Sequence, residues 1–175
     1  MKTVFTSLTI ALLLSATILT SCKGRATDGR NTTTVHVGEI EIVVRIATDE
    51  LLEQYASYVE FFDENTSQRQ WLIFTTNVAV REFRYISLEL VYDDDSEQFF
   101  IRENSVMYEL DILLPHRPFI VNWMERGTFP HAGASFLDEN NIRRYFFIGA
   151  NNADPEEDPR GPILFIERPP ISSKN

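Results

Sequence analysis

The sequence has a single cysteine and few glycines, and these two shortages exclude several kinds of chemistry. Of the 175 residues, one is cysteine and seven are glycine. A lone cysteine cannot form an intramolecular disulfide, so the folded part of the chain must be stabilised by its own hydrophobic core. The glycines do not fall at the spacing that brings backbone amides around a phosphate. We therefore expect no nucleotide partner and no cofactor.

Basic residues are also scarce. Residues 35–175 hold twelve lysines and arginines against twenty-five aspartates and glutamates, which is a formal charge of −13. Nucleic acid and anionic lipid surfaces carry charge of the same sign, and Coulomb repulsion disfavours both as partners. A solvated acidic surface is the simplest interpretation of this charge. Attraction for Ca²⁺ or for basic partners is the alternative.

Histidine and serine offer little catalytic potential. The three histidines, His36, His116 and His131, stand apart and have no cysteine beside them, whereas zinc sites need clustered nitrogen and sulfur ligands. Ser135 lies in Gly-Ala-Ser-Phe, which lacks the Gly-x-Ser-x-Gly pattern of a hydrolase nucleophile. We expect solvent-facing histidines and a structural serine.

Two acidic clusters are candidates for a hard cation. Asp93, Asp95 and Glu97 alternate along the chain, but Gln98 stands where a helix–loop–helix calcium loop requires glycine. Asp154, Glu156, Glu157 and Asp158 form the second cluster. The first group is kept as a candidate metal site, and a solvated turn is the competing interpretation.

The N-terminus has the features of a secretory signal. Met1 and Lys2 give a positive start, and residues 4–19 are mostly apolar with scattered threonine and serine. This run is too short and too polar for a good membrane-spanning helix, which needs about 20 predominantly apolar residues. After the run, Thr20 and Ser21 lead into Cys22, the only cysteine of the chain.

The four residues Leu19-Thr20-Ser21-Cys22 resemble the lipobox of bacterial lipoproteins, an aliphatic residue and two small residues before a cysteine. The resemblance covers residues 1–22 and implies removal of a signal peptide, 1–21, and acylation of Cys22. It places the protein in the bacterial cell envelope, held to a membrane by lipid, with its domain on the non-cytoplasmic side. An ordinary secretory signal with a chance cysteine, or an uncleaved anchor, is the alternative.

After the cysteine, composition divides the chain in two. Residues 22–34 are small, polar and without apolar periodicity, so we predict a lipidated cysteine followed by a flexible tether. Residues 35–175 form one predicted β-rich domain. Its expected strands cover 35–46 with a bulge or a break into two strands at Gly38-Glu39, 71–76, 80–92, 99–102, 106–112, 119–124, 133–137, 142–148 and 163–167, with turns at 103–105 and 138–141.

One helix is expected near the start of the domain, over about 49–63. Its apolar residues recur at helical spacing and form a single stripe, consisting of Leu51, Leu52, Tyr55, Tyr58, Val59 and Phe62. Short strands at close spacing with this one helix predict a mainly β fold, a single antiparallel β-sandwich-like domain. The helix would cover one outer face of it.

The function expected from these features is a non-enzymatic binding or interaction module that recognises an envelope protein or a glycan. The alternative is a carboxylate-dependent hydrolase acting on glycans, which would need two carboxyl groups facing across one cleft. Flat aromatic side chains could stack on sugars if exposed, although core packing is the more usual role. They are Trp71, Trp123, Tyr85, Tyr92, Tyr108 and Tyr145.

Overall fold

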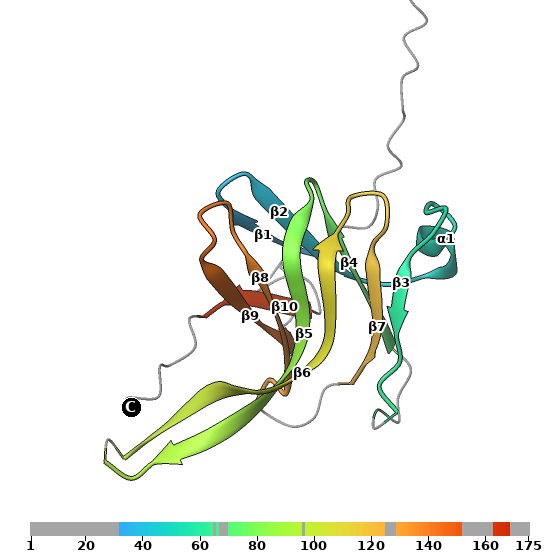
Figure 1. The fold of residues 1–175 in the computed structure, drawn as a ribbon. Helices are drawn as coiled ribbons and strands as arrows, with labels where there is room; N and C mark the ends of the chain where they lie inside the picture. The colour runs from blue at the N-terminus through green and yellow to red at the C-terminus, as the bar shows by residue number, and fades with distance from the viewer. Residues whose placement is uncertain are drawn as a thin grey trace, which may run out of the picture.

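The protein is built from two facing β-sheets, seen in a computed structural model (Figure 1). The structure describes residues 32–64, 66, 70–95, 97–124, 129–151 and 163–168. Its elements are β1 (Thr32–Val37), β2 (Ile40–Ile46), α1 (Asp49–Leu52), β3 (Val59–Phe61), β4 (Gln70–Thr76), β5 (Val80–Asp93), β6 (Gln98–Leu113), β7 (Phe119–Trp123), β8 (Ala132–Leu137), β9 (Arg143–Ala150) and β10 (Ile163–Glu167).

Each sheet has five strands. Sheet A has the order β1-β2-β4-β7-β3, and sheet B has the order β10-β9-β8-β5-β6. All neighbouring pairs are antiparallel except β3 and β7, which are parallel. At one edge the sheets meet, where the Thr33 hydroxyl of β1 donates to the Ile163 carbonyl of β10. The predicted mainly β, sandwich-like fold is confirmed.

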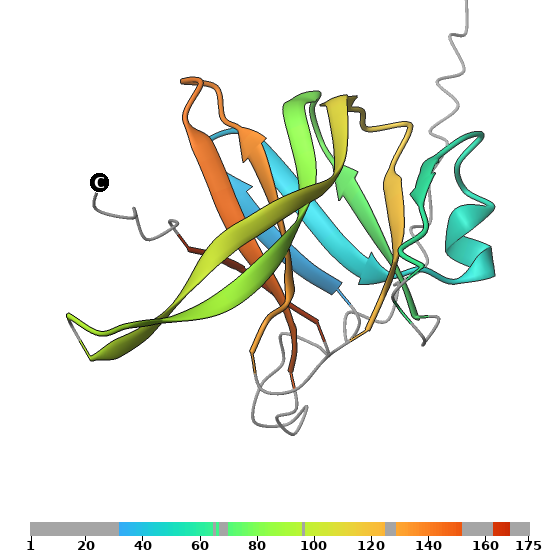
Figure 2. The ribbon, with the colours of Figure 1, turned by 60° about the horizontal axis from the view of Figure 1, so that its bottom comes forward.

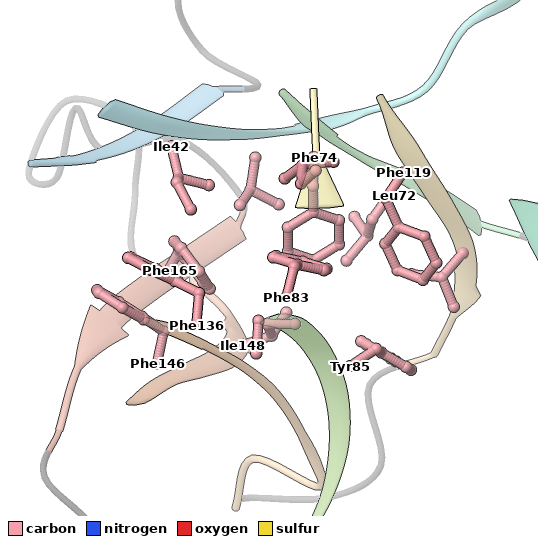
Figure 3. Close-up of a cluster of buried hydrophobic side chains, with 14 of the residues drawn as sticks. Ile42, Leu72, Phe74, Phe83, Tyr85, Phe119, Phe136, Phe146, Ile148 and Phe165 are labelled. Atoms are coloured by element: carbon pink, nitrogen blue, oxygen red, sulfur yellow. The ribbon is translucent and has the colours of Figure 1, made fainter. Parts of the chain in front are cut away.

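The core lies between the sheets and is rich in aromatic rings (Figure 3). Phe74 of sheet A lies at its centre, with its ring centroid 5.5 Å from that of Phe83 and 5.9 Å from that of Phe165, both in sheet B. Within sheet A it lies 5.8 Å from Phe119. Offset and edge-to-face aromatic contacts of this kind stabilise a core beyond the area they bury.

The helix is much shorter than predicted. α1 covers Asp49–Leu52, and Glu53 is its C-cap. Among the described residues, no helix is long and apolar enough to cross a membrane. Val59–Phe61 forms β3 instead, so the prediction of a helix reaching residue 63 is wrong. The expected covering role is partly present, because Leu51 packs against Ile73 and Ile120 on the outer face of sheet A.

Tertiary contacts hold this segment as a strand. Val59 and Phe61 of β3 pack against the main core, and the Phe61 ring lies 5.2 Å from that of Tyr108. Just after β3, the side chain of buried Asn122 on β7 accepts from the Asp63 amide at 2.6 Å and donates to the Asp63 carbonyl at 2.9 Å. Tertiary packing therefore overrides the helical spacing.

Several strand ends are shifted by one or two residues from the prediction, and two differences are larger. β1 begins at Thr32, so residues 32–34, assigned to the tether, belong to sheet A. The expected turn at residues 103–105 is absent, because β6 runs unbroken from Gln98 to Leu113 and pairs with β5 throughout. Two turns within the described residues agree with the prediction: Gly38 lies in the turn between β1 and β2 with a φ of 58°, and residues 138–142 connect β8 to β9.

Gly133 provides a direct test of how closely sheet B is packed. A Cβ atom there would lie 2.5 Å from the Phe146 carbonyl oxygen and 3.2 Å from Leu88 Cδ1, whereas a Cβ on Gly149 would meet nothing within 4 Å. We expect Gly133→Ala to lower the free energy of unfolding by about 2 kcal/mol, because backbone must shift. Gly149→Ala, the matched control, should change it by less than about 0.5 kcal/mol in urea denaturation. Equal effects would contradict this packing.

Candidate functional site

The most distinctive feature of the surface is a two-stranded arm made by the outer halves of β5 and β6. β8 pairs with β5 only as far as Ser87, and the Leu88 amide donates to the His131 carbonyl at 2.9 Å. From Glu89 to Asp93, β5 pairs only with residues 98–102 of β6 among the described strands. Both views show this ribbon extending away from the two sheets (Figure 1, Figure 2).

The arm begins at two irregularities in the pairing of β5 with β6. Register shifts lie between Tyr85 and Ile86 and between Ser87 and Leu88, and bulges of this kind bend and twist a hairpin. A polar cross-strand contact marks the same place, where the hydroxyls of Ser87 and Ser105 lie 2.8 Å apart. The arm therefore leaves the sheet at a defined neck.

One face of the arm is apolar and exposed. Leu90 pairs with Ile101 and Tyr92 pairs with Phe99, so these four side chains lie on the same face, which we call the arm face. Phe99 is 64% exposed and Tyr92 is 47% exposed, with their ring centroids 4.9 Å apart. Leu88, on the same side of β5, lies beside Gly133, so the arm face continues the outer face of sheet B.

The opposite face of the arm is mixed. The Arg102 guanidinium donates to the Glu89 carboxylate at 2.6 Å, and Val91 pairs with Phe100. At the base of the arm Glu103 pairs with Leu88 and so lies on the arm face. Burial, and then the charge of Glu103, raise the pKa of Tyr145 despite two nearby arginines. Both faces of the arm thus carry apolar and charged groups.

The predicted metal ligands lie at the tip of the arm. Asp93 ends β5, and Asp95 and Glu97 lie in the turn that follows, with the Asp95 amide donating to Asp93 at 3.2 Å. Within the described ranges, no three His, Cys, Asp or Glu side chains converge as a metal site would require. The second acidic cluster, residues 154–158, lies outside those ranges. A cation site at the tip stays a prediction.

The other predicted candidates are scattered. His36 on β1, His116 after β6 and His131 before β8 are all exposed, and Ser135 is fully buried, with the Arg143 guanidinium 3.4 Å from its hydroxyl. Leu19, Thr20, Ser21 and Cys22 lie outside the described residues. Core packing is confirmed for Tyr85 and Trp123, which are buried, but Tyr92 is exposed on the arm face.

Sequence reasoning missed the arm, although its length held a signal. β5 has 14 residues and β6 has 16, well above the usual strand length of about 5–6. A hairpin that long cannot remain over a sheet whose other strands have 8 residues or fewer. The predicted turn at residues 103–105 divided β6 into two short strands, so its unusual length was not recognised.

A carboxylate-dependent hydrolase would need a carboxyl group whose pKa is raised. Asp138, buried beside the turn between β8 and β9, shows the reverse. Burial tends to raise its pKa, but hydrogen bonds from the Ile142 amide at 2.8 Å, from Arg144 and from the Asn140 amide outweigh burial and lower it. Asp138 is therefore held as a carboxylate that fixes the turn.

Asp138→Asn tests this assignment through its pH dependence. A lowered folded-state pKa adds stability above the ordinary value of 3.8, and that stability is lost as pH falls through the folded-state pKa. We expect the variant to have a lower Tm than the parent at about pH 7, and we expect this deficit to narrow as the pH falls below 3.8. The exposed Asp111→Asn is the control. A deficit of the same size at every pH would contradict the assignment.

Comparison with known proteins gives no further guide to the site. No family model, curated protein or solved structure matches this chain. The arm, with its exposed aromatic pair and its acidic tip, is therefore the feature on which a functional assignment has to rest.

Proposed function

We propose that this protein is a bacterial envelope lipoprotein, anchored through acylated Cys22, whose domain binds an envelope protein or glycan with the β5–β6 arm. The observation that carries the binding role is the arm face. Leu90, Tyr92 and Phe99 are all exposed there, although aromatic residues at such a density normally lie in a core. Exposed aromatic rings are the side chains that contribute most to protein interfaces.

The outer part of the arm lies outside the main core, which supports a role in binding. It pairs with no other described strand, and an isolated two-stranded hairpin is marginally stable in water. The residues of the main core stop at the neck on β5, where Tyr85 is the last member of that strand. A hairpin that exposes an apolar face outside the core is best explained by a partner that covers this face.

The lipid anchor is tested by Cys22→Ala. Without the thiol no acyl chain can be attached, and burial of acyl methylene groups is what holds such a protein on a membrane. We expect the parent protein to enter the detergent phase on partitioning and the variant to remain in the aqueous phase. A variant that still enters the detergent phase would show that residues 4–19 act as an uncleaved anchor.

The binding role of the arm is tested by replacing Tyr92 and Phe99 together with serine. We expect the double variant to lose at least about tenfold in recovery of envelope protein or glycan, because exposed aromatic anchors dominate such contacts. Ile112→Ser is the matched control, since Ile112 is a 49% exposed apolar residue of β6 outside the arm. All three proteins should share one Tm. Equal recovery by all three would contradict the binding role.

A further inference from the structure

The arm is strongly acidic as well as apolar. Between Glu89 and Glu103 the chain has six carboxylates and one guanidinium. The guanidinium, that of Arg102, is bound to Glu89. A partner with basic side chains would gain from this charge, whereas a nucleic acid or an anionic lipid surface would be repelled. A second copy of the same arm would be repelled for the same reason.

The acidic groups lie at both ends of the arm face. Glu103 pairs with Leu88 at the base, on the same face as Ile101 and Phe99, and Glu97 lies in the turn at the tip. Five residues separate the two glutamates, so their Cα atoms lie at most about 20 Å apart. Phe99 and Ile101 therefore stand between Glu103 on β6 and Glu97 in the turn before it, at a sequence spacing of two residues throughout.

The β6 residues of the arm face also direct their backbone groups to the open edge of the sheet. The Leu88 amide donates to the His131 carbonyl, on the β8 side of β5, and backbone groups alternate in direction along a strand, so those of Glu89, Val91 and Asp93 point toward β6. The β6 partners of these three residues, at positions 98, 100 and 102, point back toward β5. The β6 residues that alternate with them therefore direct their N–H and C=O groups to the open edge of the arm. These residues are Phe99, Ile101 and Glu103.

We propose that the edge of β6 along residues 99–103 receives an extended, basic segment of a partner protein as an added strand. This inference rests on the proposed binding role of the arm and names the class of its partner. Apolar side chains of the segment lie beside Phe99 and Ile101, and basic side chains lie beside Glu97 and Glu103. Main-chain hydrogen bonds supply affinity in such strand addition, and alternate side chains supply specificity.

The probe is a peptide with this spacing, Lys-Thr-Val-Thr-Val-Thr-Lys, labelled with a fluorophore and titrated with the full-length protein in non-ionic detergent. We expect it to bind at least about tenfold more tightly than Glu-Thr-Val-Thr-Val-Thr-Glu at low ionic strength, with the difference shrinking at high salt. N-methylation of both valines should abolish binding, because it removes the main-chain donors.

The protein variants reverse the preference. The double variant Glu97→Lys, Glu103→Lys should bind the glutamate peptide more tightly than the lysine peptide. Asp111 is an exposed acidic residue of β6 outside the arm, so Asp111→Asn should leave both affinities unchanged. Equal affinity for the two peptides, or binding that survives N-methylation, would overturn the proposal. If neither peptide binds, but the Tyr92→Ser, Phe99→Ser double variant still loses recovery of an envelope ligand, the partner class is wrong and the binding role stands.

Discussion

The contact of Phe74 with Phe83, Phe119 and Phe165 is the interaction on which the rest of the structure depends. It joins both sheets around one ring, in a chain whose single cysteine allows no internal disulfide. Strands that contribute to this aromatic centre are held between two layers. β5 belongs to it through Phe83 and Tyr85, and beyond Ser87 the same strand leaves the core and becomes part of the arm.

The arm combines two properties that oppose each other in water. Its exposed aromatic pair favours association, whereas its excess of carboxylates disfavours association with copies of this acidic chain. Charged residues on an open sheet edge are a common protection against edge-to-edge pairing. Under the proposed function they would repel other copies of the chain and still leave the edge open to a partner of opposite charge.

Much of the fold could be predicted from alternation and turn residues. The strands around Phe74, the tight turn at Gly38 and the turn before Arg143 follow from local sequence, because period-two patterns and turn residues act over a few neighbours. The helix prediction failed at β3 because Val59 fits the helical stripe and also alternates with Phe61 as a strand residue would. Their pairing with β7, which lies about sixty residues away in the sequence, decided between the two.

The sequence by itself determined the β-rich class, the acidic charge, the lack of disulfides and the resemblance of residues 19–22 to a lipobox. Tertiary structure decided which apolar residues are buried. Alternation places Tyr85 and Tyr92 on opposite faces of β5. Tyr85 packs against Phe119 between the sheets, whereas Tyr92 lies on the outer face and is exposed. Alternation separates the two faces of a strand, but burial depends on whether another layer lies over a face. Only the packed fold fixes which face the second sheet covers.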